Sequence, residues 1–210
     1  MRMITKGAEL NSLIHHRAQA DSDYDSYAQK DELRIALVGE QKGLCCYCTG
    51  RVRAQSETMK IEHWQCQSTH PDLQLVYSNL LGACLGGKGR SPAEQHCDTK
   101  KANQDLKWNP ANAAHVIETR LRYLVDGAVE STDEEFSGQL HGVLGLNLSY
   151  LKSSRKAVLD SVLNWWRKTP NARQRVQQQI DHRTSNVAEY QPFSPVAVWF
   201  LRQKLIGAAP

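Results

Sequence analysis

The spacing of apolar residues predicts a mostly helical chain with a short central part built from strands. Apolar side chains recur three or four positions apart in several segments, as one face of an α-helix requires. Met59–His63 is predicted to be a strand. The pair Asp126-Gly127 predicts a hairpin, although a helix starting at Ala113 competes for its first half. The predicted helices are 8–18, 31–42, 149–166, 172–182 and 195–205, which gives an α+β fold class, mostly α.

The hydrophobic content is that of a globular protein with a core and without a membrane-spanning helix. Hydrophobic residues make up 40% of the 210-residue chain, enough for a core, but no run of about 18 apolar residues predicts a membrane-spanning helix. The first residues, MRMITKGAELNSL, lack the apolar core of a signal peptide, so we expect a cytoplasmic protein. In a reducing compartment its six cysteines are more readily metal ligands or reactive thiols than disulfides.

The net charge of +4 is mild, but its distribution is uneven. Between residues 150 and 183 only Asp160 and Asp181 oppose a run of basic side chains. Such a run either binds a polyanion or forms a solvated helix face, and the sequence leaves both interpretations open. The basic residues are Lys152, Arg155, Lys156, Arg167, Lys168, Arg173, Arg175 and Arg183.

Four of the six cysteines have the spacing of a zinc site. Cys45 and Cys48 are separated by two residues, and Cys84 and Cys97 by twelve. A tight turn at Cys45–Cys48 would direct two thiolates at one tetrahedral ion, although redox motifs share this spacing. We expect Cys46 to be packed rather than bound, because its side chain should point away from its ligand neighbour. Four thiolates leave no open position on zinc, so any catalysis must come from other residues.

Residues suited to such chemistry are interleaved with these cysteines. Glu62-His63 lies on the predicted strand, Asn79 follows, and Asp98 comes directly after Cys97. Taken singly, each has a plain structural interpretation: Glu62-His63 as a solvated surface pair, Asn79 and Asp98 as helix caps. Their joint order among the four cysteines favours a catalytic site.

This order resembles that of a zinc-stapled HNH nuclease. The segments EQKGLCCYC, KIEHWQ, YSNLLGAC and HCDTKK resemble PtuB, the HNH component of Septu-type anti-phage defence, which also accompanies some retrons. The motifs span about residues 40–103. The resemblance implies an N-terminal helical segment, 1–42, a ββα-metal unit with structural zinc, 43–110, and a C-terminal helical region, 111–210, as the partner-binding surface.

The resemblance also implies roles for individual residues. His63 would activate water, Glu62 and Asp98 would hold catalytic Mg²⁺ or Mn²⁺, and Asn79 would fix the loop that orients His63. Many HNH enzymes have His or Asn where this chain has Asp98, and His96 is a rival for the same place. The predicted phosphate contacts are Lys60, Lys88, Arg90, Lys100 and Lys101.

The expected function is therefore a metal-dependent endonuclease. DNA is favoured as its substrate, with structured RNA as the second candidate. The resemblance implies control by a PtuA-like ATPase and, where a retron is present, association with its reverse transcriptase and msDNA; no membrane partner is expected. Two other classes stay open: a zinc-stapled nucleic-acid- or protein-binding module, and a thiol–disulfide enzyme that uses Cys45 and Cys48.

Overall fold

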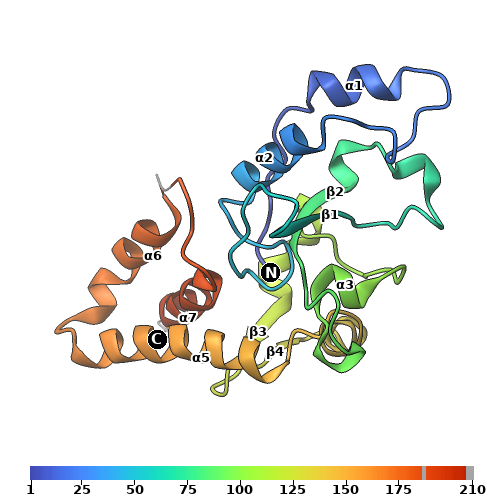
Figure 1. The fold of residues 1–210 in the computed structure, drawn as a ribbon. Coiled ribbons are helices and arrows are strands. Elements are labelled where there is room, and N and C mark those ends of the chain that lie inside the picture. Colours follow the sequence, from blue (N-terminus) through green and yellow to red (C-terminus); the bar gives the residue numbers. More distant parts are fainter. Residues whose placement is uncertain (186–187, 207–210) are drawn as a thin grey trace.

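A short antiparallel hairpin lies at the centre of the molecule, between two N-terminal helices and a larger C-terminal helical part (Figure 1). The computed structural model describes residues 1–185 and 188–206. The hairpin consists of β1 (Met59–His63) and β2 (Leu80–Cys84), paired from Met59↔Cys84 to His63↔Leu80. The predicted strand over Met59–His63 therefore has the predicted bounds.

Alternation along β1 sends its side chains to two different environments. Ile61 packs with Leu33, Leu37 and Leu80 on the side of the N-terminal helices. Lys60 and Glu62 instead form ion pairs with residues of α3 (Cys97–Lys101). The hairpin and α3 thus form the expected ββα arrangement, with the N-terminal helices on the other face.

The N-terminal helices are shorter than predicted but in the predicted places. α1 (Asn11–Arg17) buries Leu13, and α2 (Lys30–Glu40) buries Leu33 and Leu37. Two acidic residues in the first turn of α2 stabilise the helix through its dipole, whose positive end lies at the N-terminus. The side chain of Gln41, just past this helix, bonds both the amide and the carbonyl of Gly82, which ties α2 to β2.

A second hairpin follows the ββα unit. β3 (Leu121–Tyr123) pairs with β4 (Val129–Ser131), so the hairpin interpretation of Asp126-Gly127 is confirmed. The competing helix from Ala113 exists only as 3-10 turns. Gly127 has φ +84°, and a β-carbon there would lie 2.0 Å from the carbonyl oxygen of Lys152. Only glycine satisfies both constraints.

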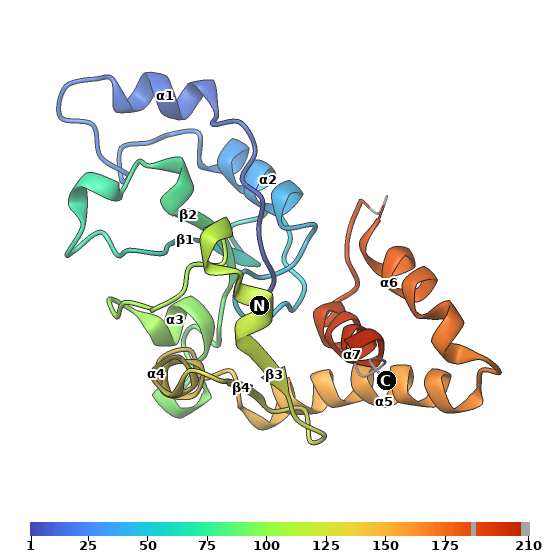
Figure 2. The ribbon, with the colours of Figure 1, turned by 180° about the vertical axis from the view of Figure 1, so that it is seen from behind.

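The chain then forms a region that the periodicity did not predict and an extended helical arm. α4 (Glu134–Gly138) continues into a π-helical turn, Gln139–Val143. The arm consists of α5 (Ser149–Lys168), α6 (Val176–Thr184) and α7 (Ser194–Ile206). Figures 1 and 2 show α5 running away from the ββα unit; α7 packs against α5, and α6 packs against α7. The remaining 3-10 turns are Pro71–Leu73, Tyr77–Asn79, Pro92–Glu94, Ala113–His115, Ile117–Arg120 and Ala172–Arg175.

One hydrophobic cluster runs from the ββα unit into the arm, with Leu81, Phe136 and Leu159 among its members. The prediction of an α+β fold, mostly α, is confirmed. The predicted domain boundary at residue 110 does not interrupt the packing, because Leu106 and Ile117 belong to the same cluster. Within residues 1–185 and 188–206, no helix combines the length and apolarity needed to cross a bilayer.

Candidate active site and metal centre

The four predicted zinc ligands come together. The sulfur atoms of Cys45, Cys48, Cys84 and Cys97 all lie within 4.8 Å of one another. Two of the sulfur–sulfur distances, Cys45–Cys97 and Cys48–Cys84, are 3.8 Å. A tetrahedral zinc ion with bonds of about 2.3 Å requires sulfur–sulfur edges of about 3.8 Å, so the cluster fits one such ion.

Backbone amides around the cluster also suit thiolate ligands. The amide of Gly50 donates to Sγ of Cys48, and the amide of Cys84 donates to Sγ of Cys45, both at 3.3 Å. The turn that carries the first two thiols is closed by the bond from the amide of Cys45 to the carbonyl of Gly50. Charged sulfur is stabilised by such donors, as in other closed zinc sites.

The two remaining cysteines lie outside this cluster. Cys46 is buried, and its amide donates to Gly82, in agreement with the packed position that we expected. Cys66 contacts the hydroxyls of Ser68 and Thr69 instead. His96 lies against the thiols, with Nδ1 at 3.1 Å from Sγ of Cys97. It is therefore not a rival of Asp98 at the carboxylates described next.

The two predicted metal-binding carboxylates meet between β1 and α3. Glu62 is 2% exposed, and Asp98 is close enough to raise its pKa. Oε1 of Glu62 also accepts from the hydroxyl of Tyr47 at 2.7 Å and lies 2.9 Å from Nζ of Lys101. Asp98 is held by Lys60 at 2.8 Å. Two carboxylates and two ammonium groups therefore share one largely dry volume.

Burial separates the pKa values of the two acids. Burial, followed by the neighbouring charge of Asp98, raises the pKa of Glu62 well above its usual range. Burial also acts to raise the pKa of Asp98, but hydrogen bonds with Glu62 and Lys60 outweigh it and lower that pKa. The two carboxyl groups therefore differ in acidity, and Glu62 is the weaker acid. Hard divalent cations prefer such oxygen donors, so the pair fits Mg²⁺ or Mn²⁺ chemically.

His63 ends β1 on the opposite side of the strand from Glu62. Its Nε2 lies 3.0 Å from the carbonyl oxygen of Gln74 and 3.3 Å from Nε2 of Gln67. A carbonyl can only accept, so Nε2 carries the hydrogen and Nδ1 is the atom left to accept a proton. Burial lowers the pKa of His63, which keeps the imidazole neutral at pH 7.

The structure places Asn79 where the loop between the strands must be closed. Its Oδ1 accepts from the amide of Gln65 at 2.8 Å, and its Nδ2 donates to the carbonyls of Gln65 and Leu73. These bonds fasten both ends of the segment that carries Gln74, the partner of His63. The contacts agree with the predicted loop-fixing role of Asn79.

Sequence reasoning missed two tyrosines of this site. The ring of Tyr24 meets that of His63 edge-on, with centroids 4.5 Å apart, and its amide bonds the side chain of Gln74. Tyr47 sits in the zinc-binding turn yet holds Glu62. Tyr24 lies in a polar N-terminal loop with no local signal, whereas the position of Tyr47 between Cys45 and Cys48 could have pointed to it.

The predicted phosphate contacts divide into three groups. Lys88 and Arg90 are exposed on the loop between β2 and α3, and Lys100 is half-buried. Lys60 is half-buried in its pair with Asp98. Lys101 is fully buried, so the prediction that it contacts nucleic acid was wrong. Its position four residues after Cys97 turns it inward with that thiol.

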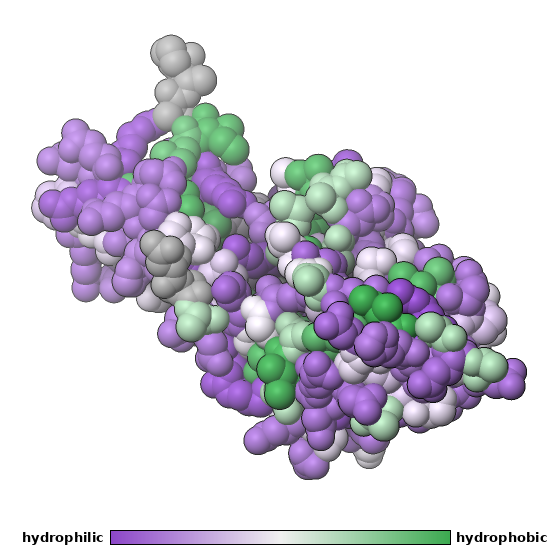
Figure 3. All heavy atoms as spheres, turned by 90° about the horizontal axis from the view of Figure 1, so that it is seen from above, coloured by the Kyte–Doolittle hydropathy of each residue, from purple (hydrophilic) through white to green (hydrophobic). Residues whose placement is uncertain are grey.

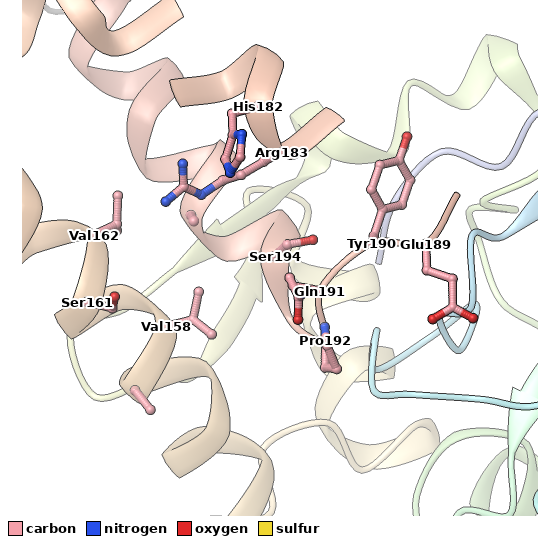
Figure 4. Close-up of a pocket in the computed structure, with 12 residues that line it drawn as sticks. Val158, Ser161, Val162, His182, Arg183, Glu189, Tyr190, Gln191, Pro192 and Ser194 are labelled. Atoms are coloured by element: carbon pink, nitrogen blue, oxygen red, sulfur yellow. The ribbon is translucent and has the colours of Figure 1, made fainter. Parts of the chain in front are cut away.

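A cavity of about 580 Å³ lies elsewhere, between α5, α6 and residues 189–197 (Figure 4). Val158 and Val162 form an apolar wall, and Arg183 lines the side that α6 contributes. Glu189 is its carboxylate, and that group is already paired with Arg51 at 3.1 Å and Arg53 at 2.8 Å. Neither Glu62 nor Asp98 is among the residues that line this cavity.

Comparison with known proteins agrees with the motif order. No family model matches the chain. The chain is similar to Septu protein PtuB from Bacillus thuringiensis, with 27% identity over 104 residues, 48% of this chain and 37% of that protein. It is also similar to the Retron Ec83 putative HNH endonuclease from Escherichia coli, with 29% identity over 124 residues, 51% of this chain and 48% of that protein. The chain thus spans less than half the length of each relative. These matches confirm the resemblance that the motifs carry, and they make the chain a relative of the PtuB-type HNH proteins.

Proposed function

We propose that the chain is a metal-dependent HNH endonuclease that hydrolyses phosphodiester bonds in nucleic acid. The observation that supports it best is the junction of β1 and α3. There Lys101 holds Glu62 and Lys60 holds Asp98. Glu62 lies one position along β1 from His63, whose Nδ1 is left to accept a proton. The similarity to a protein named as a putative HNH endonuclease points the same way.

His63 acts as the general base. The carbonyl of Gln74 holds Nε2–H, so the imidazole is fixed in one tautomer with Nδ1 ready to take a proton from water. Its lowered pKa keeps this base in the neutral form at pH 7. The edge-on ring of Tyr24 limits rotation of the imidazole.

Glu62 and Asp98 are the residues that would hold the catalytic cation, Mg²⁺ or Mn²⁺. When bound, that ion supplies positive charge to the phosphate oxygens and lowers the pKa of a bound water. Lys101 and Tyr47 hold Oε1 of Glu62 in place. Zinc held by the four thiolates has a closed coordination shell and serves to position α3.

The substrate is DNA in preference to structured RNA, and the enzyme is the effector of an anti-phage defence system. A partner ATPase of the PtuA kind controls it, and in a retron context a reverse transcriptase and its msDNA accompany it. This part of the proposal follows the resemblance that the motifs carry, and the two relatives are named as a Septu protein and a retron protein. The arm α5–α7, with its apolar cavity, is the surface that we assign to the partner.

The test is cleavage by the wild type and by His63→Ala. Loss of the general base should lower kcat about 10²- to 10⁴-fold while zinc content and the free energy of unfolding change little. His70→Ala is the matched control, because His70 lies in the loop that follows β1, is half-exposed and pairs with Asp105. Plasmid DNA and total RNA are incubated with Mg²⁺, Mn²⁺ or chelator, with and without the co-expressed ATPase.

One observation favours a second candidate, a zinc-stapled binding module. Lys101 already provides a positive charge at Glu62, and His63 is only 9% exposed. A module of this kind would bind nucleic acid or protein without cleaving. If no condition gives cleavage, and His63→Ala binds as the wild type does, the module is the correct interpretation.

A further inference from the structure

A group of basic side chains at the far end of the arm has no acidic partners. Arg167, Lys168, Arg173 and Arg175 surround the turn from α5 to α6, and all four are exposed. Of the described ion pairs, none includes any of these four residues. Residues 161–180 contain no Asp or Glu.

Several basic residues between positions 150 and 183 are buried or paired and so are not available to bind a ligand. Arg155 is buried, where it donates to the carbonyls of Gly127 and Leu146, so it cannot reach a ligand. Lys152 and Lys156 are paired with Asp126 and Asp160, both at 2.5 Å. Arg183 is half-buried, donates to the carbonyl oxygen and the side chain of Gln179, and lines the cavity. The exposed charge left without an ion pair is therefore concentrated at one end of the arm. We call Arg167, Lys168, Arg173 and Arg175 the distal basic cluster.

The cluster lies well away from the ββα unit. Tyr150, at the start of α5, meets the ring of His96 beside the thiols, with centroids 5.5 Å apart. From Tyr150 to Lys168 the helix advances 18 residues, which is about 27 Å at 1.5 Å per residue. Figure 3 shows this end of the molecule, at the left, covered mainly by hydrophilic residues.

We propose that the distal basic cluster is a second nucleic-acid contact, which binds backbone phosphates well away from the scissile one. It rests on the proposed function only in taking nucleic acid as the ligand. Arginine and lysine without carboxylate partners pay no cost of breaking an ion pair when they meet a phosphate. The contact is to the backbone, so it adds affinity and salt dependence without adding sequence preference.

The expected magnitude follows from counterion release. Each phosphate contact contributes about 0.9 to the slope of log K against log salt. If two of the four side chains engage phosphates, their removal lowers the slope by about 1.8 and weakens binding at 0.1 M salt by about 60-fold.

The experiment measures binding without cleavage. Zinc-loaded protein that carries His63→Ala is titrated, in Mg²⁺-free buffer, into a fluorescent 30-base-pair duplex across a series of salt concentrations. Arg167, Lys168, Arg173 and Arg175 are replaced by Gln together. The matched control replaces four basic residues that do have carboxylate partners, again by Gln: Arg122, Lys152, Lys156 and Arg202.

The cluster variant should lose more than tenfold in affinity and at least one unit of slope, while the control loses less than threefold. Equal losses in both variants would mean that only net charge matters and would overturn the proposal. An unchanged slope in the cluster variant would also overturn it; if that variant no longer co-purifies with the ATPase, the cluster binds protein instead. Failure of the wild type to cleave would refute the proposed function alone, because this assay needs no turnover.

Discussion

The clearest energetic prediction concerns Lys101, whose ammonium group is fully buried. Its Nζ lies 2.9 Å from Oε1 of Glu62 and 3.2 Å from the carbonyl oxygen of His63. Lys101→Met keeps most of the apolar stem and removes the charge. Glu62, Asp98 and Lys60 are then left with one positive charge for two carboxyl groups.

The cost can be estimated from this geometry. Removing one partner of a buried ion pair costs about 3–5 kcal/mol, because the other charge stays desolvated. For a chain of this size, each kcal/mol lowers Tm by about 2–4 °C, so we expect a fall of about 6–20 °C. Lys100→Met is the matched control: Lys100 is half-buried, its Nζ lies 3.4 Å from the carbonyl oxygen of Pro92, and its loss should cost under about 1 kcal/mol.

The pH dependence gives a sharper assay. In the variant, Glu62 loses its ammonium partner, so its already raised pKa in the folded state rises further. A carboxyl group whose pKa is raised by folding contributes stability at low pH, and that stability is lost as pH rises above the unfolded value of 4.5. Urea unfolding at pH 5 and at pH 8 should therefore show a larger deficit at pH 8. A deficit no greater than that of Lys100→Met, or one independent of pH, would refute the placement of Lys101 against Glu62.

Three other predictions test the remaining parts of the site. The wild type should contain one zinc per chain by mass spectrometry of metals, and Cys45→Ser should lose most of it whereas Cys46→Ser should not. Asn79→Ala should cost about 2–3 kcal/mol, seen in urea unfolding, and should speed hydrogen exchange at the amide of Gln65, which loses its acceptor. Tyr24→Ala should lower kcat up to about tenfold with little change in KM, while Tyr24→Phe, which keeps the ring against His63, should stay within about twofold.

Local patterns predicted much of this molecule because local physics determines it. The bounds of Met59–His63 and the position of the hairpin at Asp126-Gly127 follow from alternation and from a turn that needs glycine. The pairing of Cys45–Cys48 with Cys84 and Cys97 follows from the ligand count of a tetrahedral ion. Helix ends were less accurate: the helix expected over 8–18 extends only from Asn11 to Arg17, because helix ends fray and caps are absent there.

Contacts between distant segments could not be predicted in this way. Nothing in the polar loop around Tyr24 indicates that its ring lies against His63, 39 residues further on. Lys100 and Lys101 look equivalent in HCDTKK, and only the orientation of α3 buries the second of them. The burial of Lys101 could have been predicted from its spacing, because it lies four residues after Cys97 and therefore on the same face of the helix.

The thiol cluster and the carboxylate pair are structurally coupled, because α3 contributes residues to both. This helix has only five residues, too few to be stable alone, and its first residue, Cys97, has φ +54°, a conformation that costs about 1–2 kcal/mol outside glycine. The thiol cluster offsets that strain and fixes Asp98 and Lys101 against Glu62. Losing the zinc should therefore abolish the carboxylate site as well as the fold of the region, since metal binding there is folding free energy. Only substitutions outside α3, at His63 or Tyr24, can change the activity of the site without also unfolding it.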